Sequence, residues 1–110
     1  MLVQLRKITV KEGFSEKIVE RFGKPGGPMS EIPGFIDRSV MVKKNRKKGE
    51  ETEEVIVMIR WESEEAWKTW EKSPAHIEGH RNKRNQEKPD YLLDTEVSMY
   101  LVKTPEQVEV

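Results

Sequence analysis

The stretch at residues 52–72, TEEVIVMIRWESEEAWKTWEK, joins a strand pattern directly to a helix pattern. Its β-branched run at 55–59, VIVMI, favours a strand over 52–61. Ser63, followed by acidic residues, is typical of a helix N-terminus, and we expect a helix over 63–72. Because VIVMI is apolar on both of its faces, the strand should be covered on both sides of its sheet.

Three further strands and one further helix are expected around this segment. Strand-like sequences occur at 2–10, 35–44 and 91–102. The sequence FSEKIVERF places apolar residues at helical spacing, with Ser15 as a possible cap. A loop rich in Gly and Pro over 23–34 has room for one helical turn at MSEI.

The predicted order of elements is β-α-β-β-α-β, the ferredoxin-like arrangement of the α+β class with an antiparallel sheet. Helices then cover one face of the sheet only. The apolar second face of 55–59 therefore predicts pairing with another copy, as a homodimer that forms an α+β barrel. With 110 residues in all, we expect one domain over 1–103 and a frayed tail over 104–110.

Composition and charge narrow the class of partner. The chain has 20 Lys and Arg against 20 Asp and Glu, which predicts neither nucleic acid nor a membrane as partner. It has no Cys, so disulfides and thiolate metal ligands are excluded. Arg6 and Lys7 interrupt the apolar start, and no stretch approaches the roughly 20 apolar residues of a spanning helix. We expect a soluble, cytoplasmic protein.

Both histidines of the chain lie in the sequence SPAHIEGHRNKR at 73–84. His76 and His80 are four residues apart, so on a continuous helix they share a face and could bind a metal ion together. Two ligands do not complete a metal site. The zincin patterns would need Glu where Ile77 or Gly79 stands. The alternative is a pair of exposed or capping imidazoles.

Ser73 and Pro74 predict a break after the helix at 63–72, because Ser suits a cap and Pro suits the first helical position. Gly79 then falls inside the second helix, where Gly costs about 1 kcal/mol relative to Ala. Gly79 either leaves room beside His80 for a flat ligand or eases helix packing.

All three tryptophans, Trp61, Trp67 and Trp70, fall within residues 61–70. Beside a histidine pair they fit an apolar pocket for an aromatic ligand. The same spacing fits ordinary core packing, since Trp67 and Trp70 lie three residues apart on one helical face. Spacing alone leaves both interpretations open.

Two smaller polar groups are candidates for ligand contacts. Gln4 and Arg6 lie two apart on the first strand, so both point to one face and could place a donor against the helices. Beyond the second histidine, a cationic group could meet carboxylates of a ligand or form a solvated helix end; its members are Arg81, Lys83 and Arg84.

The sequence RWESEEAWKTWEKSPAHIEGH, with ten residues from Trp70 to His80, and the upstream IPGFIDRSVM resemble the IsdG-type haem-degrading monooxygenases of the antibiotic-biosynthesis monooxygenase superfamily. The resemblance covers residues 2 to about 102. It implies a dimeric ferredoxin-like fold and oxygen-dependent opening of the porphyrin ring with release of iron, in which haem is both cofactor and substrate. Because no dinucleotide or flavin fingerprint is present, electrons should come from a separate reductase or a small external reductant.

The resemblance also implies roles for single residues. His80 is expected as the axial ligand of the haem iron, and Trp70 as the residue that presses on the porphyrin. Trp67 is expected to line the same pocket. A family Asn on the first strand falls at Arg6, which is therefore expected as the distal hydrogen-bond donor. His76 falls where the family carries an aromatic residue and receives no role.

Three other functions fit parts of the pattern. The chain could carry or sense haem without degrading it. It could instead oxidise an aromatic substrate without a metal, with the histidines assisting proton transfer. A plain dimeric barrel without chemistry is the third. The pairing of Trp70 with His80 favours the two haem functions over the others.

Overall fold

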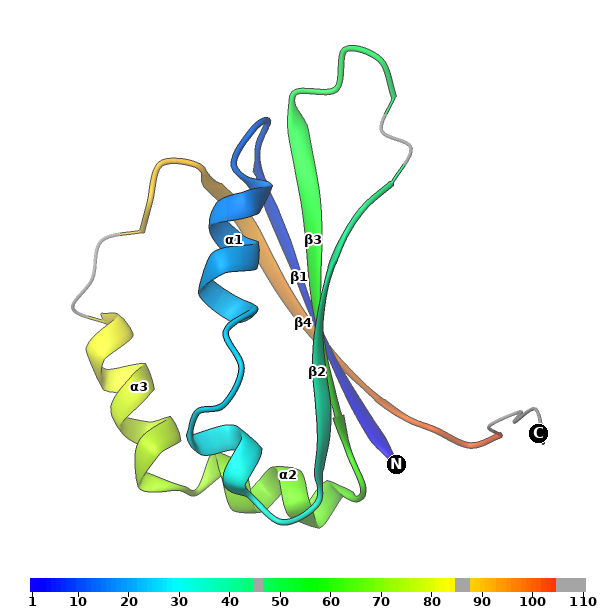
Figure 1. The fold of residues 1–110 in the computed structure, drawn as a ribbon, viewed down its shortest axis with the longest axis vertical. Helices are drawn as coiled ribbons and strands as arrows, with labels where there is room; N and C mark the ends of the chain where they lie inside the picture. Colours follow the sequence, from blue (N-terminus) through cyan, green and yellow to red (C-terminus); the bar gives the residue numbers. More distant parts are fainter. Residues whose placement is uncertain (45–46, 85–87, 105–110) are drawn as a thin grey trace.

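Four strands form a single antiparallel sheet in the computed structural model, which describes residues 1–44, 47–84 and 88–104 (Figure 1). The strands are β1 (Leu2–Lys11), β2 (Phe35–Val42), β3 (Thr52–Trp61) and β4 (Leu92–Leu101). The helical elements are α1 (Ser15–Phe22), the 3₁₀ helix η1 (Pro28–Glu31), α2 (Glu64–Glu71) and α3 (Pro74–Arg84). The sheet order β2-β3-β1-β4 confirms the predicted ferredoxin-like α+β fold.

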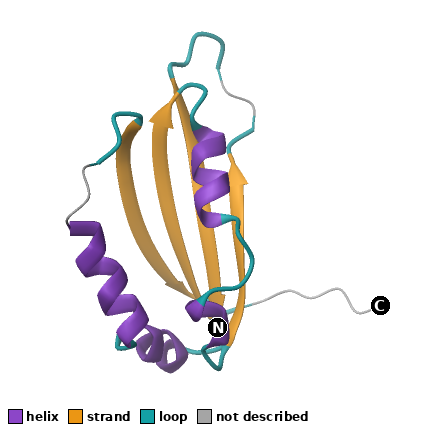
Figure 2. Cartoon of the chain, turned by 60° about the vertical axis from the view of Figure 1, so that its left-hand side comes forward, coloured by secondary structure: helices purple, strands orange, loops and turns teal. Residues whose placement is uncertain are grey.

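The helices all lie on one face of the sheet (Figure 2). Successive side chains of a strand point to opposite faces, and β3 shows this alternation along most of its length. Its side chains toward the helices are buried, namely those of Val55, Val57, Ile59 and Trp61. The core therefore lies between one face of the sheet and the helices.

Trp61 belongs to this core. It is fully buried, and its ring meets the ring of Phe35 edge to face at a centroid distance of 5.5 Å. Ile18 from α1 and Ala66 from α2 are buried against the same face of the sheet. Of the two interpretations of the tryptophans, core packing is the correct one for Trp61.

The opposite face of the sheet carries no helix. The strand register places a group of apolar side chains there, namely Leu5, Met41, Ile56 and Met58. The prediction of a strand with two apolar faces is therefore confirmed for β3, and the second face is only half-buried within one chain.

Two serine hydroxyls set the ends of the helices after β3, as predicted. The Ser63 side chain accepts a hydrogen bond from the backbone N–H of Ala66 at 3.2 Å, which caps α2. The Ser73 hydroxyl donates to the carbonyl of Trp70 at 2.7 Å and accepts from the N–H of His76 at 3.3 Å. A single side chain thus contacts the end of α2 and the start of α3.

The prediction that Ser15 caps α1 is wrong. Ser15 is the first residue of α1, and Phe14, at the cap position, makes no side-chain capping bond. The carboxylate of Glu53 on β3 accepts from the N–H groups of Gly13 and Ser15, and from the Ser15 hydroxyl at 3.2 Å. A carboxylate from a distant strand therefore stabilises the positive end of this helix.

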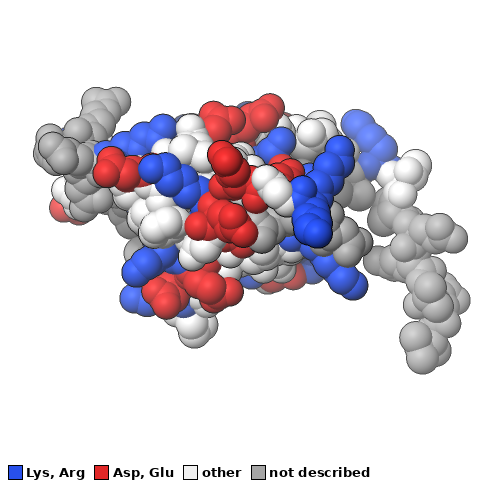
Figure 3. Space-filling model, turned by 90° about the horizontal axis from the view of Figure 1, so that it is seen from above, with Lys and Arg blue, Asp and Glu red and all other residues white. Residues whose placement is uncertain are grey.

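Charged side chains of both signs share the surface. Figure 3 views the molecule from above, and basic and acidic side chains are interspersed on this end. No helix in the described part of the chain is long and apolar enough to cross a membrane.

The tail predicted at 104–110 lies outside the described residues from 105 onward, as do residues 45–46 of the loop between β2 and β3.

Candidate active site

A cavity of about 500 Å³ lies between α3 and the helix-facing side of the sheet. This volume is within the roughly 300–1,000 Å³ of small-molecule sites. Apolar side chains from the sheet line it, namely Val57, Ile59 and Val97. The sequence from the end of α2 into α3 lines the opposite side with Trp70, Glu71, His76, Gly79 and His80. The structure therefore brings Trp70 and His80 together at one apolar cavity.

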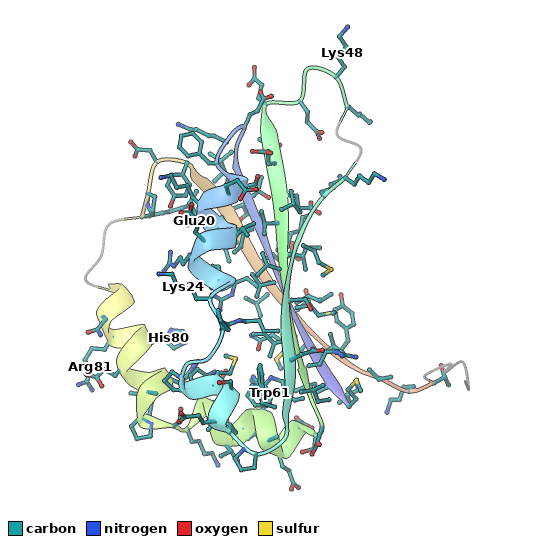
Figure 4. All side chains as sticks on the ribbon, in the orientation of Figure 1. Glu20, Lys24, Lys48, Trp61, His80 and Arg81 are labelled. Carbon is teal, nitrogen blue, oxygen red and sulfur yellow. The ribbon has the colours of Figure 1, made fainter. Side chains whose placement is uncertain are left out.

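His80 lies on the side of α3 that faces the sheet, and Arg81 points the opposite way (Figure 4). His80 is exposed, so a ligand entering the cavity can reach its imidazole. Of the two roles considered for Arg81, this placement agrees with the solvated helix end and not with contact to a ligand in this cavity. The side chains of Lys83 and Arg84 lie outside the described part of the structure.

Three aromatic rings form a row beside the cavity. The His76 ring meets the Trp70 ring edge to face at a centroid distance of 5.1 Å, and it meets the His80 ring at 4.4 Å in the same manner. His76 Nε2 lies 3.0 Å from Glu71 Oε2. Sequence reasoning gave His76 no role, and the helical i, i+4 spacing was the signal that placed it beside His80.

Arg6 and Gln4 from β1 both line the cavity, as their shared strand face predicts. The Arg6 guanidinium lies 5.9 Å from the ring centroid of Phe22. Burial lowers the pKa of Arg6, the charge of Arg21 lowers it further, and Glu71 opposes both. Within the described residues, Arg6 makes no hydrogen bond or ion pair, so its donors can turn to a ligand.

Gly79 presents open space on the cavity side of α3. A Cβ added at Gly79 would meet no atom within 4 Å. No neighbouring group therefore requires a glycine here for packing. Of the two reasons considered for this residue, room beside His80 agrees with the geometry.

Trp67 is not brought to this cavity. It lines a separate pocket of about 240 Å³ with Leu2, Met99 and Leu101. Trp67 precedes Trp70 by three residues, which displaces it by about 4.5 Å along α2 and turns it about 60° around the axis. The expectation that Trp67 lines the pocket of His80 is therefore not supported, because this rotation directs it toward the end of the sheet where β1 begins and β4 ends.

A bare metal ion has no complete site at the two histidines. Within the described ranges, no group of three or more His, Cys, Asp or Glu side chains is arranged to hold a metal ion. An axial ligand to a haem iron is a single imidazole, since the macrocycle supplies the other nitrogen ligands. His80 on its own satisfies that requirement.

Comparison with known proteins agrees with the fold. A family model described as antibiotic biosynthesis monooxygenase matches residues 1–82. The chain belongs to the antibiotic biosynthesis monooxygenase family. A curated relative, the heme-degrading monooxygenase HmoA of Bacillus subtilis, is 55% identical over 97% of this chain and 95% of its own. A heme-degrading monooxygenase of Bacillus thuringiensis is 31% identical over 94% and 91% of the two chains.

Solved structures share the same architecture. A crystal structure from Bacillus cereus superposes with a TM-score of 0.81 at 43% identity, covering 97% of both chains. The heme-degrader MhuD of Mycobacterium tuberculosis, solved with two hemes in its active site, has a TM-score of 0.66 over 97% of this chain and all of its own. At 23% identity, that likeness shows the fold alone.

Proposed function

We propose that this chain is a haem-degrading monooxygenase, which opens the porphyrin ring with molecular oxygen and external reductant and releases iron. The observation that carries the proposal is the placement of His80 and Trp70 on one apolar cavity of about 500 Å³. The 55% identity to an enzyme named as a heme-degrading monooxygenase supports it over nearly the full chain.

The residues of the cavity fit a tetrapyrrole. A neutral imidazole such as that of His80 binds haem iron, and the apolar side chains of β3 and β4 suit the macrocycle. The open side of Gly79 leaves room for a flat ligand next to the imidazole. Arg38 of β2, which also lines the cavity, supplies positive charge that suits the carboxylates of haem.

Each side chain then has a distinct task toward the substrate. His80 would hold the haem iron from the α3 side, and the Trp70 ring would press on the macrocycle and orient it in the cavity. Arg6 approaches from the sheet as a donor; because a guanidinium has no acceptor, it orients and stabilises charge rather than removing a proton. Bound haem supplies the iron chemistry that activates oxygen, while the protein contributes orientation, distortion and exclusion of water.

The proposal includes the assembly and the electron source. Two copies pair through the face without helices, where Leu5, Ile56 and Met58 lie, as a homodimeric α+β barrel. A light-scattering mass equal to one chain would contradict the dimer.

Electrons come from a separate reductase or a small reductant, since the sequence has no dinucleotide fingerprint. We place the protein in the cytoplasm, with residues 1–103 as its single domain.

The test is a turnover assay with hemin. Purified protein titrated with hemin should develop a Soret band, and with ascorbate, catalase and air that band should disappear as chelatable iron appears. The mass of the product then identifies the opened tetrapyrrole. A Soret band that persists through reductant and oxygen would replace the enzyme with a haem carrier. Failure to bind hemin at all would favour a monooxygenase without a metal.

Variants of His80 on α3 and of Arg6 on β1 test the role proposed for each residue. His80→Ala should remove the axial ligand and with it most of the hemin affinity, whereas Arg81→Ala, on the opposite side of α3, should leave the titration unchanged. Arg6→Asn should keep hemin binding and change the rate or the product. If Arg6→Asn changes neither, the first strand contributes little to the reaction.

A further inference from the structure

His76 is a half-buried imidazole to which the proposed reaction gives no task. Its side chain is only 17% exposed, although it belongs to a helix with no fully buried residue among those described. Its ring contacts those of Trp70 and His80, and its Nε2 lies 3.0 Å from Glu71 Oε2. So many directed contacts on one polar side chain imply that its orientation is fixed.

The contact between His76 and Glu71 joins two helices across a break. Glu71 is the last residue of α2, and His76 lies in the first turn of α3. The Ser73 hydroxyl between them contacts the end of α2 and the start of α3. A carboxylate–imidazole pair at this place restrains the angle between the two helices, and hence the position of His80 relative to Trp70.

The ring contacts carry that restraint to the proposed iron ligand. The centroid distance of 4.4 Å between His76 and His80 leaves little room for the His80 ring to turn without displacing His76. His76 cannot turn freely either, because its Nε2 contacts Glu71 and its ring meets the Trp70 ring at a centroid distance of 5.1 Å. Both imidazoles belong to one helix and lie on the same side of the cavity, so His76 is a neighbour of the ligand and not a second ligand from the opposite side.

We propose that His76, held by Glu71, is a positioning residue that fixes the orientation of the His80 ring and its spacing from Trp70. The inference rests on the proposed function for its consequence, which is a single defined geometry of His80 at the haem iron. Groups that orient a metal ligand in this way typically change metal affinity by about 10- to 100-fold when removed.

A first experiment uses the protein without haem. In ¹⁵N- and ¹³C-labelled protein, His76→Ala should shift and broaden the ring resonances of His80 and weaken its nuclear Overhauser contacts to neighbouring side chains. His76→Phe keeps a ring beside His80 but loses the contact with Glu71, so it should restore the His80 signal only in part. Glu78→Ala, which removes an exposed carboxylate from the same helix, is the control and should leave those signals unchanged. Unaltered His80 resonances in His76→Ala would overturn the proposal.

A second experiment uses the ferric haem complex. His76→Ala and Glu71→Ala should lower hemin affinity by about 10- to 100-fold and broaden the electron paramagnetic resonance of the iron, because His80 would adopt several orientations. Glu71→Gln keeps a hydrogen-bonding oxygen and should stay close to the wild type. A role confined to helix packing would lower thermal stability but leave the resonance line shape unchanged, and that result would overturn the proposal.

The two experiments separate this inference from the proposed function. If the wild type binds no hemin, the proposed function fails, and the His80 resonances of the haem-free protein still decide whether His76 positions that ring. If the wild type binds and degrades hemin while His76→Ala retains wild-type resonances and affinity, the enzyme stands and the positioning role is rejected.

Discussion

α2 and α3 follow each other directly, yet they relate to the sheet in different ways. α2 buries Ala66 against the core and begins at a capped, acidic first turn. α3 buries no described side chain fully, contains Gly79, and lines a cavity. Its ribbon stands apart from the sheet (Figures 1 and 2). α2 derives its stability from packing on the sheet. α3 is stabilised mainly by its own backbone hydrogen bonds and by its junction with α2.

This difference separates the scaffold from the site. A helix that packed fully on the sheet would fill the space that a ligand needs. A helix that stands away from the sheet keeps that space but has fewer contacts to hold it in place. Binding of haem between α3 and the sheet would then supply contacts that α3 lacks, so the ligand would contribute to the stability of its own site.

The largest effect on stability should come from removing the tryptophan of the core, compared with removing the tryptophan of the cavity wall. Trp61→Ala removes a fully buried ring and should reduce the free energy of unfolding by about 3–5 kcal/mol. Trp70→Ala, at the cavity wall, should reduce it by clearly less, because its ring is only partly buried. Urea denaturation measures both. Equal losses would mean that the cavity wall is as tightly packed as the core.

An intermediate effect should come from the two serine caps. Ser63→Ala removes the cap of the packed helix and should reduce the free energy of unfolding by about 1 kcal/mol. Ser73→Ala should leave global unfolding nearly unchanged and speed amide hydrogen exchange within α3, because that helix can open alone. A global loss in Ser73→Ala as large as that in Ser63→Ala would show that α3 unfolds together with the sheet.

The smallest effect should come from Gly79→Ala. Alanine should stabilise the α3 helix by at most about 1 kcal/mol, and slower amide exchange in α3 is the measurement. The added methyl group meets no protein atom but enters the space beside His80, so hemin affinity should fall while the helix becomes more stable. A rise in both hemin affinity and α3 stability would show that the ligand does not use the space beside Gly79.

The sequence predicted the strands and helices well because the patterns that specify them involve residues close together in the chain. The strand at 52–61, the cap at Ser63 and the break at Ser73 each depend on residues a few positions apart. The cap of α1 could not be predicted, since Glu53 lies 38 residues from Ser15 and reaches it only through the folded sheet. Local signals fail where the partner is distant in sequence.

The site was predictable in part for the same reason. Helical spacing placed His76 beside His80, but the bond from His76 to Glu71 depends on the angle between two helices. Spacing also could not tell Trp67 from Trp70, because the two share a helical face and differ only in which pocket each reaches. Resemblance to a family supplied the choice of Trp70.

The position of β1 in the sheet has a consequence for how the site accepts a reacting molecule. β1 is hydrogen-bonded to β3 on one side and to β4 on the other, so the wall that carries Arg6 is firmly held within the sheet. The opposite wall is a helix with few anchors. Porphyrin is flat and rigid, whereas its opened product is bent and flexible, so an enclosure with one immovable side and one adjustable side can accommodate both shapes and then let the product leave.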